Sequence, residues 1–173
     1  MEAPADRDAA LARYKEGPAL LERALAGLKD AELDAAPAKG GWTIRQIAHH
    51  VVDGDDLWKT CIKMALGNEQ TEFALGWYWA QPQDVWVERW AYASRPLDES
   101  LALLRANRAH VLQLLEHVPD AWRRSVRLVR PDGQAERLPV GAVVAMHADH
   151  VAHHVDRILA IRRELDAAQG IVP

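Results

Sequence analysis

The chain has 173 residues, of which 49% are hydrophobic and 27% charged, and its formal net charge at pH 7 is −4. These values exclude a disordered chain and predict one domain, residues 1–173, around one hydrophobic core. Acidic and basic residues are scattered together, so no basic stripe predicts binding to nucleic acid or to an anionic membrane. The N-terminus has no apolar signal segment and no run approaches the roughly 18 apolar residues of a membrane span, so we expect a cytoplasmic protein.

The single cysteine, Cys61, limits the metal chemistry. One thiol cannot form an internal disulfide, which agrees with a reducing compartment, and it cannot form a cysteine cluster. Any metal ion must therefore be held by histidine and carboxylate side chains.

Two helices are predicted in the first part of the chain. Apolar periodicity predicts the first over 18–28, with its proline in the first turn, and the residues before it form either a short helix or a frayed tail. The second is predicted over 44–66, because Thr43 stands where an N-cap belongs and Gln46 follows as a capping-box partner. A Gly-Asn pair ends it.

The rest of the chain is predicted to hold two more long helices. The irregular stretch 69–95 contains one short helix, "QDVWVERWA". A strong helix over 97–118 begins after one proline and stops before another. The segment "SVRLVRPDGQAERLPV" alternates around a Pro-Asp-Gly turn, which predicts a hairpin, and a last helix covers 140–166. The predicted fold is therefore all-α, a four-helix bundle with a small β-hairpin before the last helix.

Tryptophan is unusually frequent, with seven against one phenylalanine and three tyrosines. Trp77, Trp79, Trp86 and Trp90 fall in one stretch. Such a cluster either packs in the core and at interfaces or lines a ligand cleft. Trp77 and Trp79 are therefore candidates for a pocket wall.

Helical phase separates the histidines of the last helix. Its buried stripe is defined by Val143, Ile158, Ile161 and Leu165. Because successive helical residues turn by about 100°, His147, His150 and His154 share this phase, whereas His153 lies toward the margin. His150 and His154 are one turn apart on the same face, which is how a helix presents two ligands to one metal ion.

Helical phase also distinguishes the two neighbouring histidines His49 and His50. On the predicted helix 44–66, His50 lies at the edge of the buried side and His49 points toward solvent. If the bundle brings the two helices together, His50, His150 and His154 converge. Three neutral nitrogen ligands leave coordination positions open, as in catalytic metal sites. The alternative is that each histidine is a core residue with its own hydrogen-bond partner.

The other candidates are secondary. His147 is a neighbour of the ligands or part of the pocket wall, and Asp53 either orients a ligand or is a plain surface carboxylate. His110 and His117 share a face but are nearly two turns apart, too far to chelate one ion. No motif places a serine or cysteine nucleophile beside a base, so residues that act in catalysis, apart from metal ligands, are not assigned.

Two segments, "GGWTIRQIAHHVVDGDDLW" and "HADHVAHHVDRI", resemble the DinB-like superfamily, which includes YfiT-like metal-dependent hydrolases. They look closest to its bacillithiol transferase subgroup. The matching positions are Trp42-Thr43 at the start of the second helix, His50 eight residues after the tryptophan, and His150-x-x-x-His154. The order of elements is similar over residues 15–165.

The resemblance implies a four-helix bundle, often a homodimer, in which His50, His150 and His154 hold a divalent zinc or nickel ion. One implied activity is the transfer of a low-molecular-weight thiol of the bacillithiol type to a small-molecule electrophile. Hydrolysis by metal-activated water is an alternative, and a non-catalytic metal- or ligand-binding bundle is another. We favour thiol transfer because no carboxylate general base stands obviously beside the ligands in the sequence.

Overall fold

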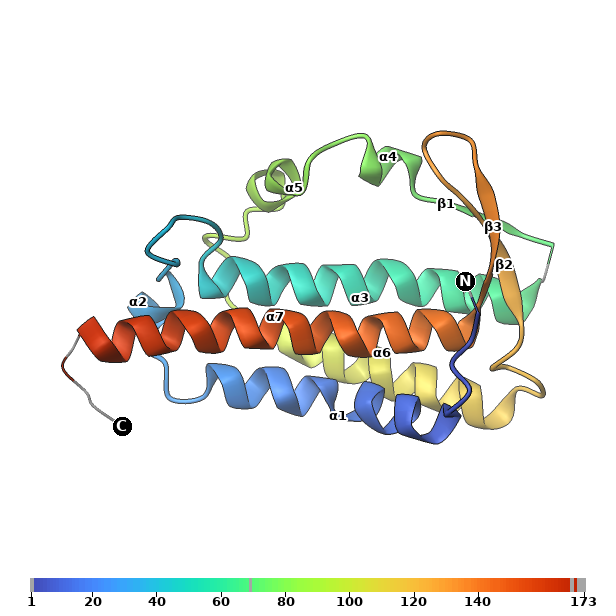
Figure 1. Cartoon of the computed structure of the whole chain (residues 1–173), viewed down its shortest axis with the longest axis horizontal. Coiled ribbons are helices and arrows are strands. Elements are labelled where there is room, and N and C mark those ends of the chain that lie inside the picture. The colour runs from blue at the N-terminus through green and yellow to red at the C-terminus, as the bar shows by residue number, and fades with distance from the viewer. Residues whose placement is uncertain (1, 69, 169, 171–173) are drawn as a thin grey trace.

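The computed structural model describes residues 2–68, 70–168 and 170, and four long helices pack side by side along its length (Figure 1). They are α1 (Arg7–Leu25), α3 (Ile44–Gly67), α6 (Asp98–His117) and α7 (Val140–Ala168). Helix α1 packs against α6 and α7, and α3 packs against the same two helices, which gives a four-helix bundle. The predicted all-α bundle is confirmed.

The helix that follows the Gly-Gly pair begins as its capping residues predict. The Thr43 Oγ1 accepts a hydrogen bond from the Gln46 backbone N–H at 3.2 Å, and the Gln46 Oε1 accepts one from the Thr43 N–H at 2.9 Å. This reciprocal capping box satisfies two N–H groups that the helix itself leaves unpaired. It fixes the start of α3, and therefore the position of every side chain along that helix.

The predicted first helix is wrong in its bounds and in the position of its proline. Helix α1 begins eleven residues before Pro18 and carries that proline inside it. Proline has no N–H, so the carbonyl oxygen of Tyr14, four residues earlier, is not used by the helix. That oxygen instead accepts a hydrogen bond from the Arg108 Nη1 at 2.6 Å. A side chain from α6 thus compensates for the helix bond that Pro18 removes.

The hairpin before the last helix is present, and a third strand joins it. Strands β2 (Ser125–Val129) and β3 (Ala135–Pro139) pair antiparallel, and β1 (Glu72–Ala74) pairs parallel with β2. The sequence did not predict β1, because a three-residue strand is too short to show alternation. Its Phe73 is buried against the end of the bundle.

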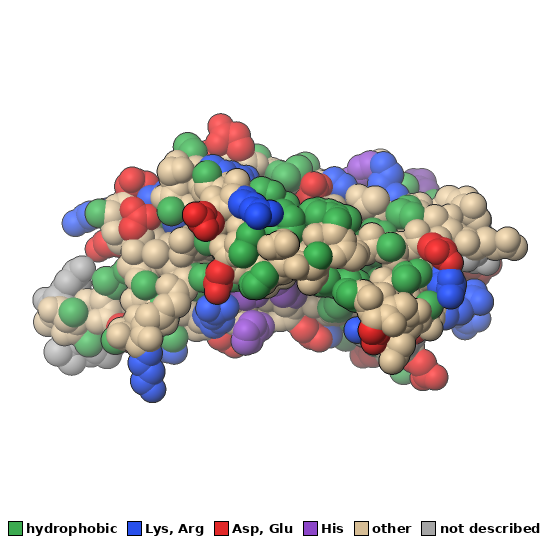
Figure 2. Space-filling view, turned by 90° about the horizontal axis from the view of Figure 1, so that it is seen from above, with side chains coloured by type: hydrophobic (Ala, Val, Ile, Leu, Met, Phe, Trp, Pro, Cys, Tyr) green, Lys and Arg blue, Asp and Glu red, His purple; other side chains and the backbone are tan. Residues whose placement is uncertain are grey.

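The segment 70–97, which we call the strap, runs over α3 and includes α4 (Gly76–Trp79) and α5 (Gln83–Arg89); the short helix α2 (Asp30–Leu33) precedes α3 (Figure 1). The predicted short helix of the strap is therefore present as α5. The indole N–H of Trp42 donates to the Asp84 Oδ1 at 2.6 Å and ties the strap to the start of α3. Seen from the strap side, hydrophobic side chains gather at the middle of the molecule, close to histidines (Figure 2).

None of the helices in the described residues has the length and apolar character required to cross a membrane.

Candidate metal centre

Three imidazoles from two helices meet beneath the strap. His50 comes from α3, and His150 and His154 come from successive turns of α7. The ring centroids are 5.1 Å apart for His50 and His150, 4.8 Å for His50 and His154, and 4.5 Å for His150 and His154. One ring nitrogen from each residue lies within 4.8 Å of the others. The structure therefore brings together the three residues that helical phase and the resemblance selected.

Burial keeps these three rings neutral. It lowers the pKa of His50 from 6.5 to about 4, and the neighbouring Arg157 contributes to the same effect. Burial followed by repulsion from His50 lowers the pKa of His150 to about 3. Burial and the two neighbouring rings also lower the pKa of His154. Neutral imidazole is the form of histidine that binds a metal ion.

The arrangement of these nitrogens fits a divalent cation. The Nε2 atoms of His50 and His150 face each other at 3.2 Å, and the buried Nδ1 of His150 has no hydrogen-bond partner. Nitrogen ligands at about 2.1 Å from a tetrahedral zinc ion lie about 3.4 Å apart. The Nε2 atoms of His50 and His150 already have about this spacing, and the third ring, whose nitrogen lies within 4.8 Å of the other two, would move closer to hold an ion. Three nitrogens also leave a coordination position for another molecule, which a closed structural site does not.

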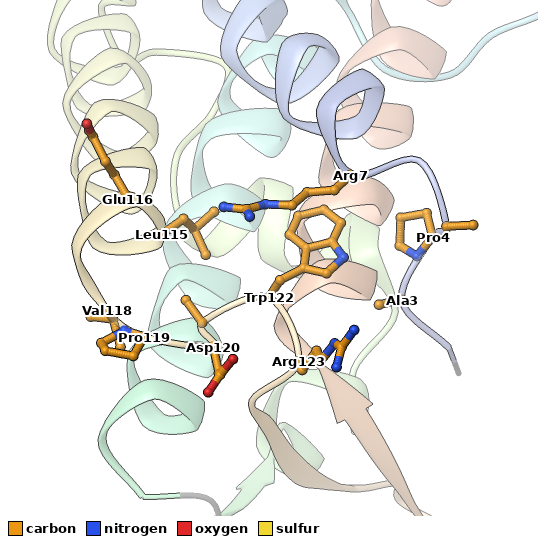
Figure 3. A pocket seen from close by; sticks show the side chains of 12 residues that line it. Ala3, Pro4, Arg7, Leu115, Glu116, Val118, Pro119, Asp120, Trp122 and Arg123 are labelled. Atoms are coloured by element: carbon orange, nitrogen blue, oxygen red, sulfur yellow. The ribbon is translucent and has the colours of Figure 1, made fainter.

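A cavity of about 250 Å³ opens beside the cluster. It is lined by residues from α3, the strap and α7: His50, Gly54, Leu57, Trp58, Tyr78, Gln83, Met146, His147 and His150. A larger cavity of about 770 Å³ lies near the start of the chain and the end of α6, around Trp122, between Arg7 and Arg123 (Figure 3). That second cavity has no histidine in its lining, so the smaller one is the candidate site.

His147 lines the cavity and is backed by a buried ion pair. Its Nδ1 has no hydrogen bond and lies 3.6 Å from the Asp55 Oδ1. The same oxygen accepts a hydrogen bond from the Arg108 Nε at 3.0 Å, and Arg108 Nη2 donates to the His147 carbonyl at 2.9 Å. Because Nδ1 faces the carboxylate, Nε2 is the ring nitrogen available to a molecule in the cavity. Burial lowers the pKa of His147 well below 6.5, so the ring is neutral.

The prediction that His49 points to solvent is wrong. The residue is fully buried, its Nε2 donates to the Arg95 carbonyl at 3.0 Å, and its Nδ1 accepts from the Ser100 hydroxyl at 2.9 Å. Burial lowers the pKa of His49, which agrees with a neutral ring that donates at one nitrogen and accepts at the other. Both partners lie away from the three-histidine cluster, so His49 ties α3 to α6 and to the end of the strap.

The other candidate residues lie outside the cavity. Asp53 forms an ion pair with Arg95 at 3.2 Å and contacts no residue of the cluster by hydrogen bond. Trp77 is 52% exposed, and Trp79 packs against Trp58 without lining the cavity; Trp58 and Tyr78 form the aromatic wall instead. His110, His117 and His153 are exposed.

Two buried charged residues behind His147 were not identified from the sequence. Asp55 and Arg108 are 2% and 1% exposed. A signal was available. Asp55 is four residues after the buried Val51, and Arg108 is four residues after the buried Leu104, so both charges stand on apolar stripes.

Fold and site together define a four-helix bundle with a three-imidazole cluster beside a small cavity. The profile of the DinB superfamily matches residues 13–158. A protein of Geobacillus thermodenitrificans (strain NG80-2) named "Putative metal-dependent hydrolase" is 28% identical over 153 residues, which cover 88% of this chain and 82% of that protein. A Geobacillus kaustophilus (strain HTA426) protein with the same description is 30% identical over 149 residues, which cover 84% of this chain and 78% of that protein.

A solved structure agrees in fold. YfiT from Bacillus subtilis, described as "a probable metal-dependent hydrolase with an unusual four-helix bundle topology", aligns with a TM-score of 0.78 at 24% identity and covers 95% of this chain and 90% of its own. The chain belongs to the DinB superfamily.

The buried neutral rings predict acid sensitivity of the metal-free protein. In the unfolded chain each histidine has a pKa near 6.5, whereas the folded values lie lower, at about 4 for His50 and about 3 for His150. Between these limits the unfolded state binds more protons, so stability is lost as pH falls from about 6.5 toward 4. Urea unfolding in the presence of a chelator at pH 7.5, 6.5, 5.5 and 4.5 measures this. The slope of the unfolding free energy against pH should be shallower in His150→Ala than in the wild type and unchanged in the exposed His153→Ala. Equal slopes in all three proteins would contradict the prediction.

Proposed function

We propose that the protein is a metal-dependent enzyme in which His50, His150 and His154 hold a divalent cation, zinc or nickel, and that it transfers a low-molecular-weight thiol to an electrophilic substrate. One observation carries the proposal: three neutral imidazoles converge beside a cavity whose wall holds a fourth imidazole, His147, next to a buried carboxylate. A divalent cation at such a site supplies Lewis acidity, which lowers the pKa of a thiol or of water.

The chain provides an acceptor for the proton that a thiol must lose. His147 is neutral, and its Nε2 is the nitrogen free to take that proton from the cavity; because burial lowers its pKa, it is a weaker base than a free imidazole and requires a thiol that the cation has acidified. The Asp55 carboxylate, 3.6 Å from Nδ1, stabilises the imidazolium that results, and Arg108 fixes the carboxylate. An imidazole hydrogen-bonded to a carboxylate is a recurrent general base, and here the two groups lie just beyond hydrogen-bond distance, at 3.6 Å. The thiolate, which is the nucleophile, attacks an electrophilic carbon and forms a C–S bond. In a substitution the bond to the leaving group breaks and that group departs as an anion, such as the chloride of monochlorobimane; in an addition to a double bond the proton on His147 returns to the adjacent carbon.

Two features favour a thiol as the nucleophile. Metal hydrolases normally place an aspartate or glutamate where it can take a proton from water. The described residues that line the cavity include no carboxylate, and Leu57, Trp58 and Met146 make its walls apolar. The sulfhydryl group of a thiol is more weakly hydrated than water and is better suited to such walls, while the charged groups of a thiol such as glutathione would remain outside the cavity. The resemblance of the histidine segments to bacillithiol transferases supports the same nucleophile.

Hydrolysis is the second candidate, because the relatives from two Geobacillus species carry the name "Putative metal-dependent hydrolase". In addition, His147 could take a proton from water as well as from a thiol. The test uses one zinc- or nickel-loaded protein with two substrates. We expect monochlorobimane to be consumed only when metal and a thiol (bacillithiol, mycothiol or glutathione) are both present. Ester hydrolysis of p-nitrophenyl acetate without thiol, together with no turnover with any of the three thiols, contradicts transfer and supports hydrolysis.

The His147→Gln variant tests, in the same assay, whether His147 accepts the proton. It retains the three proposed ligands, so its metal content should stay that of the wild type. Removing a general base typically costs about 10²–10⁴-fold in rate, and we expect a loss in kcat within this range. His153→Gln, an exposed histidine on the same helix, is the matched control and should retain full activity. A His147→Gln protein with wild-type kcat shows that the proton goes elsewhere.

A further inference from the structure

The cavity beside the three histidines also constrains the second substrate. We infer that the electrophile is small and uncharged, with an apolar body that packs on Leu57, Trp58 and Met146 and one hydrogen-bond acceptor that binds the side-chain amide of Gln83. This inference rests on the proposed function, since it names the substrate class of that site.

The size of the cavity sets the first limit. Its volume is about 250 Å³, which is below the range of about 300–1,000 Å³ that is typical of pockets for drug-sized ligands. The strap bounds it through Tyr78 and Gln83, and Trp42, bonded to Asp84, holds the strap on α3. The part of a substrate that this cavity encloses is therefore about the size of a single substituted ring, and the rest of a larger substrate would extend toward solvent.

The charge of the lining sets the second limit. Among the described residues that line the cavity there is no aspartate, glutamate, lysine or arginine. The nearest buried charges, Asp55 and Arg108, are paired with each other behind His147. The thiolate of the proposed reaction neutralises part of the charge of the cation. A charged electrophile would thus lose its hydration without gaining a counter-ion from these walls, which is unfavourable.

The side-chain amide of Gln83 offers the electrophile a polar contact. The Tyr78 hydroxyl donates to the Gln83 Oε1 at 2.7 Å, and the Tyr78 ring stacks on Trp86 at 5.5 Å with an interplanar angle of 16°. The oxygen of the amide is thus engaged by a side chain that is itself held in place. The Nε2 of Gln83 makes no hydrogen bond with the described residues and is the donor left for a ligand. A carbonyl, nitro or ether oxygen on the substrate would satisfy it.

The test compares three ligands of almost equal shape and different charge. Benzamide is neutral, benzoate is an anion and benzamidine is a cation; a ligand-observed NMR titration measures their dissociation constants. The titration is done on the zinc-loaded protein and again with a chelator, because carboxylates also bind cations directly. In chelator we expect benzamide to bind at least about tenfold more tightly than either charged ligand, since an unpaired charge is costly to bury. Equal or tighter binding of a charged ligand in chelator, or no binding of benzamide, overturns the inference.

The contact with Gln83 is tested with a matched pair of variants. A net hydrogen bond contributes about 0.5–1.5 kcal/mol, so Gln83→Leu should weaken benzamide about 2- to 13-fold and leave toluene, which has no acceptor, unchanged. Gln81→Leu makes the same substitution two residues earlier on the strap, outside the cavity lining, and should change neither. Unchanged benzamide binding in Gln83→Leu overturns the role of the amide. Binding in chelator requires no metal or thiol, so this result is independent of whether the thiol transfer is found.

Discussion

Replacing His150 with alanine is expected to abolish binding of the divalent cation. His150 contacts both other imidazoles: its Nε2 lies 3.2 Å from that of His50, and its ring centroid lies 4.5 Å from that of His154. Its removal leaves two nitrogens, and two ligands hold a divalent ion poorly. Losing an outer partner of a ligand already costs about 10–100-fold in metal affinity, so losing a ligand should cost at least about 100-fold. Elemental analysis should find about one ion per wild-type chain and nearly none in the variant.

A thermal unfolding series separates a lost ligand from a lost fold. Cation present at about 100 times its dissociation constant stabilises a folded protein by about 2.7 kcal/mol, which raises the melting temperature of the wild type but not of His150→Ala. In chelator at neutral pH the variant should still unfold cooperatively from a folded state, because it loses one ring contact and the 3.2 Å contact with the His50 Nε2 but also removes a buried Nδ1 that has no hydrogen-bond partner. His153→Ala is the control and should bind the ion normally. Equal metal content in all three proteins contradicts the assignment of His150.

The three proposed ligands could be selected from the sequence because helical phase is a local property. The capping box at Thr43 sets the start of α3, and the His150-x-x-x-His154 spacing sets a shared face on α7. The prediction for His49 was wrong because helical phase does not report how many neighbours cover a helix. Helix α3 is covered by α6, α7 and the strap, so its buried arc is wider than the apolar stripe alone indicates. The width of that arc depends on neighbours, which a single helix does not specify.

The cavity could not be predicted from the sequence for a related reason. Its wall includes Tyr78 and Gln83, which lie in the irregular strap, where no period indicates which side chains face inward. The four tryptophans of that stretch allowed either core packing or a pocket wall, and Trp86 and Trp90 take the first role, since both stack on Tyr78 and pack against the core. The tryptophan that lines the site, Trp58, comes from α3.

Replacing Arg108 with methionine is expected to destabilise the protein by about 3–5 kcal/mol, since it leaves the buried carboxylate of Asp55 without its partner. The guanidinium, 1% exposed, binds Asp55, the Tyr14 carbonyl and the His147 carbonyl, and therefore joins α6 to α3, α1 and α7. Methionine fills similar space but donates no hydrogen bond. Urea unfolding at pH 7.5 measures the loss. Arg105→Met, on the same helix but paired with Glu22 at the surface, should change stability by less than about 0.5 kcal/mol.

A second substitution tests the packing of Arg108, because the Arg108 side chain lies directly against the backbone of α1. Gly17 has no side chain, and a Cβ at that position would lie 2.1 Å from the Arg108 Nη1, so Gly17→Ala should itself cost about 1–3 kcal/mol through overpacking. In the double variant with Arg108→Met the clash with the guanidinium is gone. The loss of unfolding free energy in the double variant should therefore be smaller than the sum of the two single losses, by at least about 0.5 kcal/mol. Strict additivity would mean that Gly17 is required for the backbone of α1 near Pro18, and that the fit between Gly17 and Arg108 does not contribute to stability.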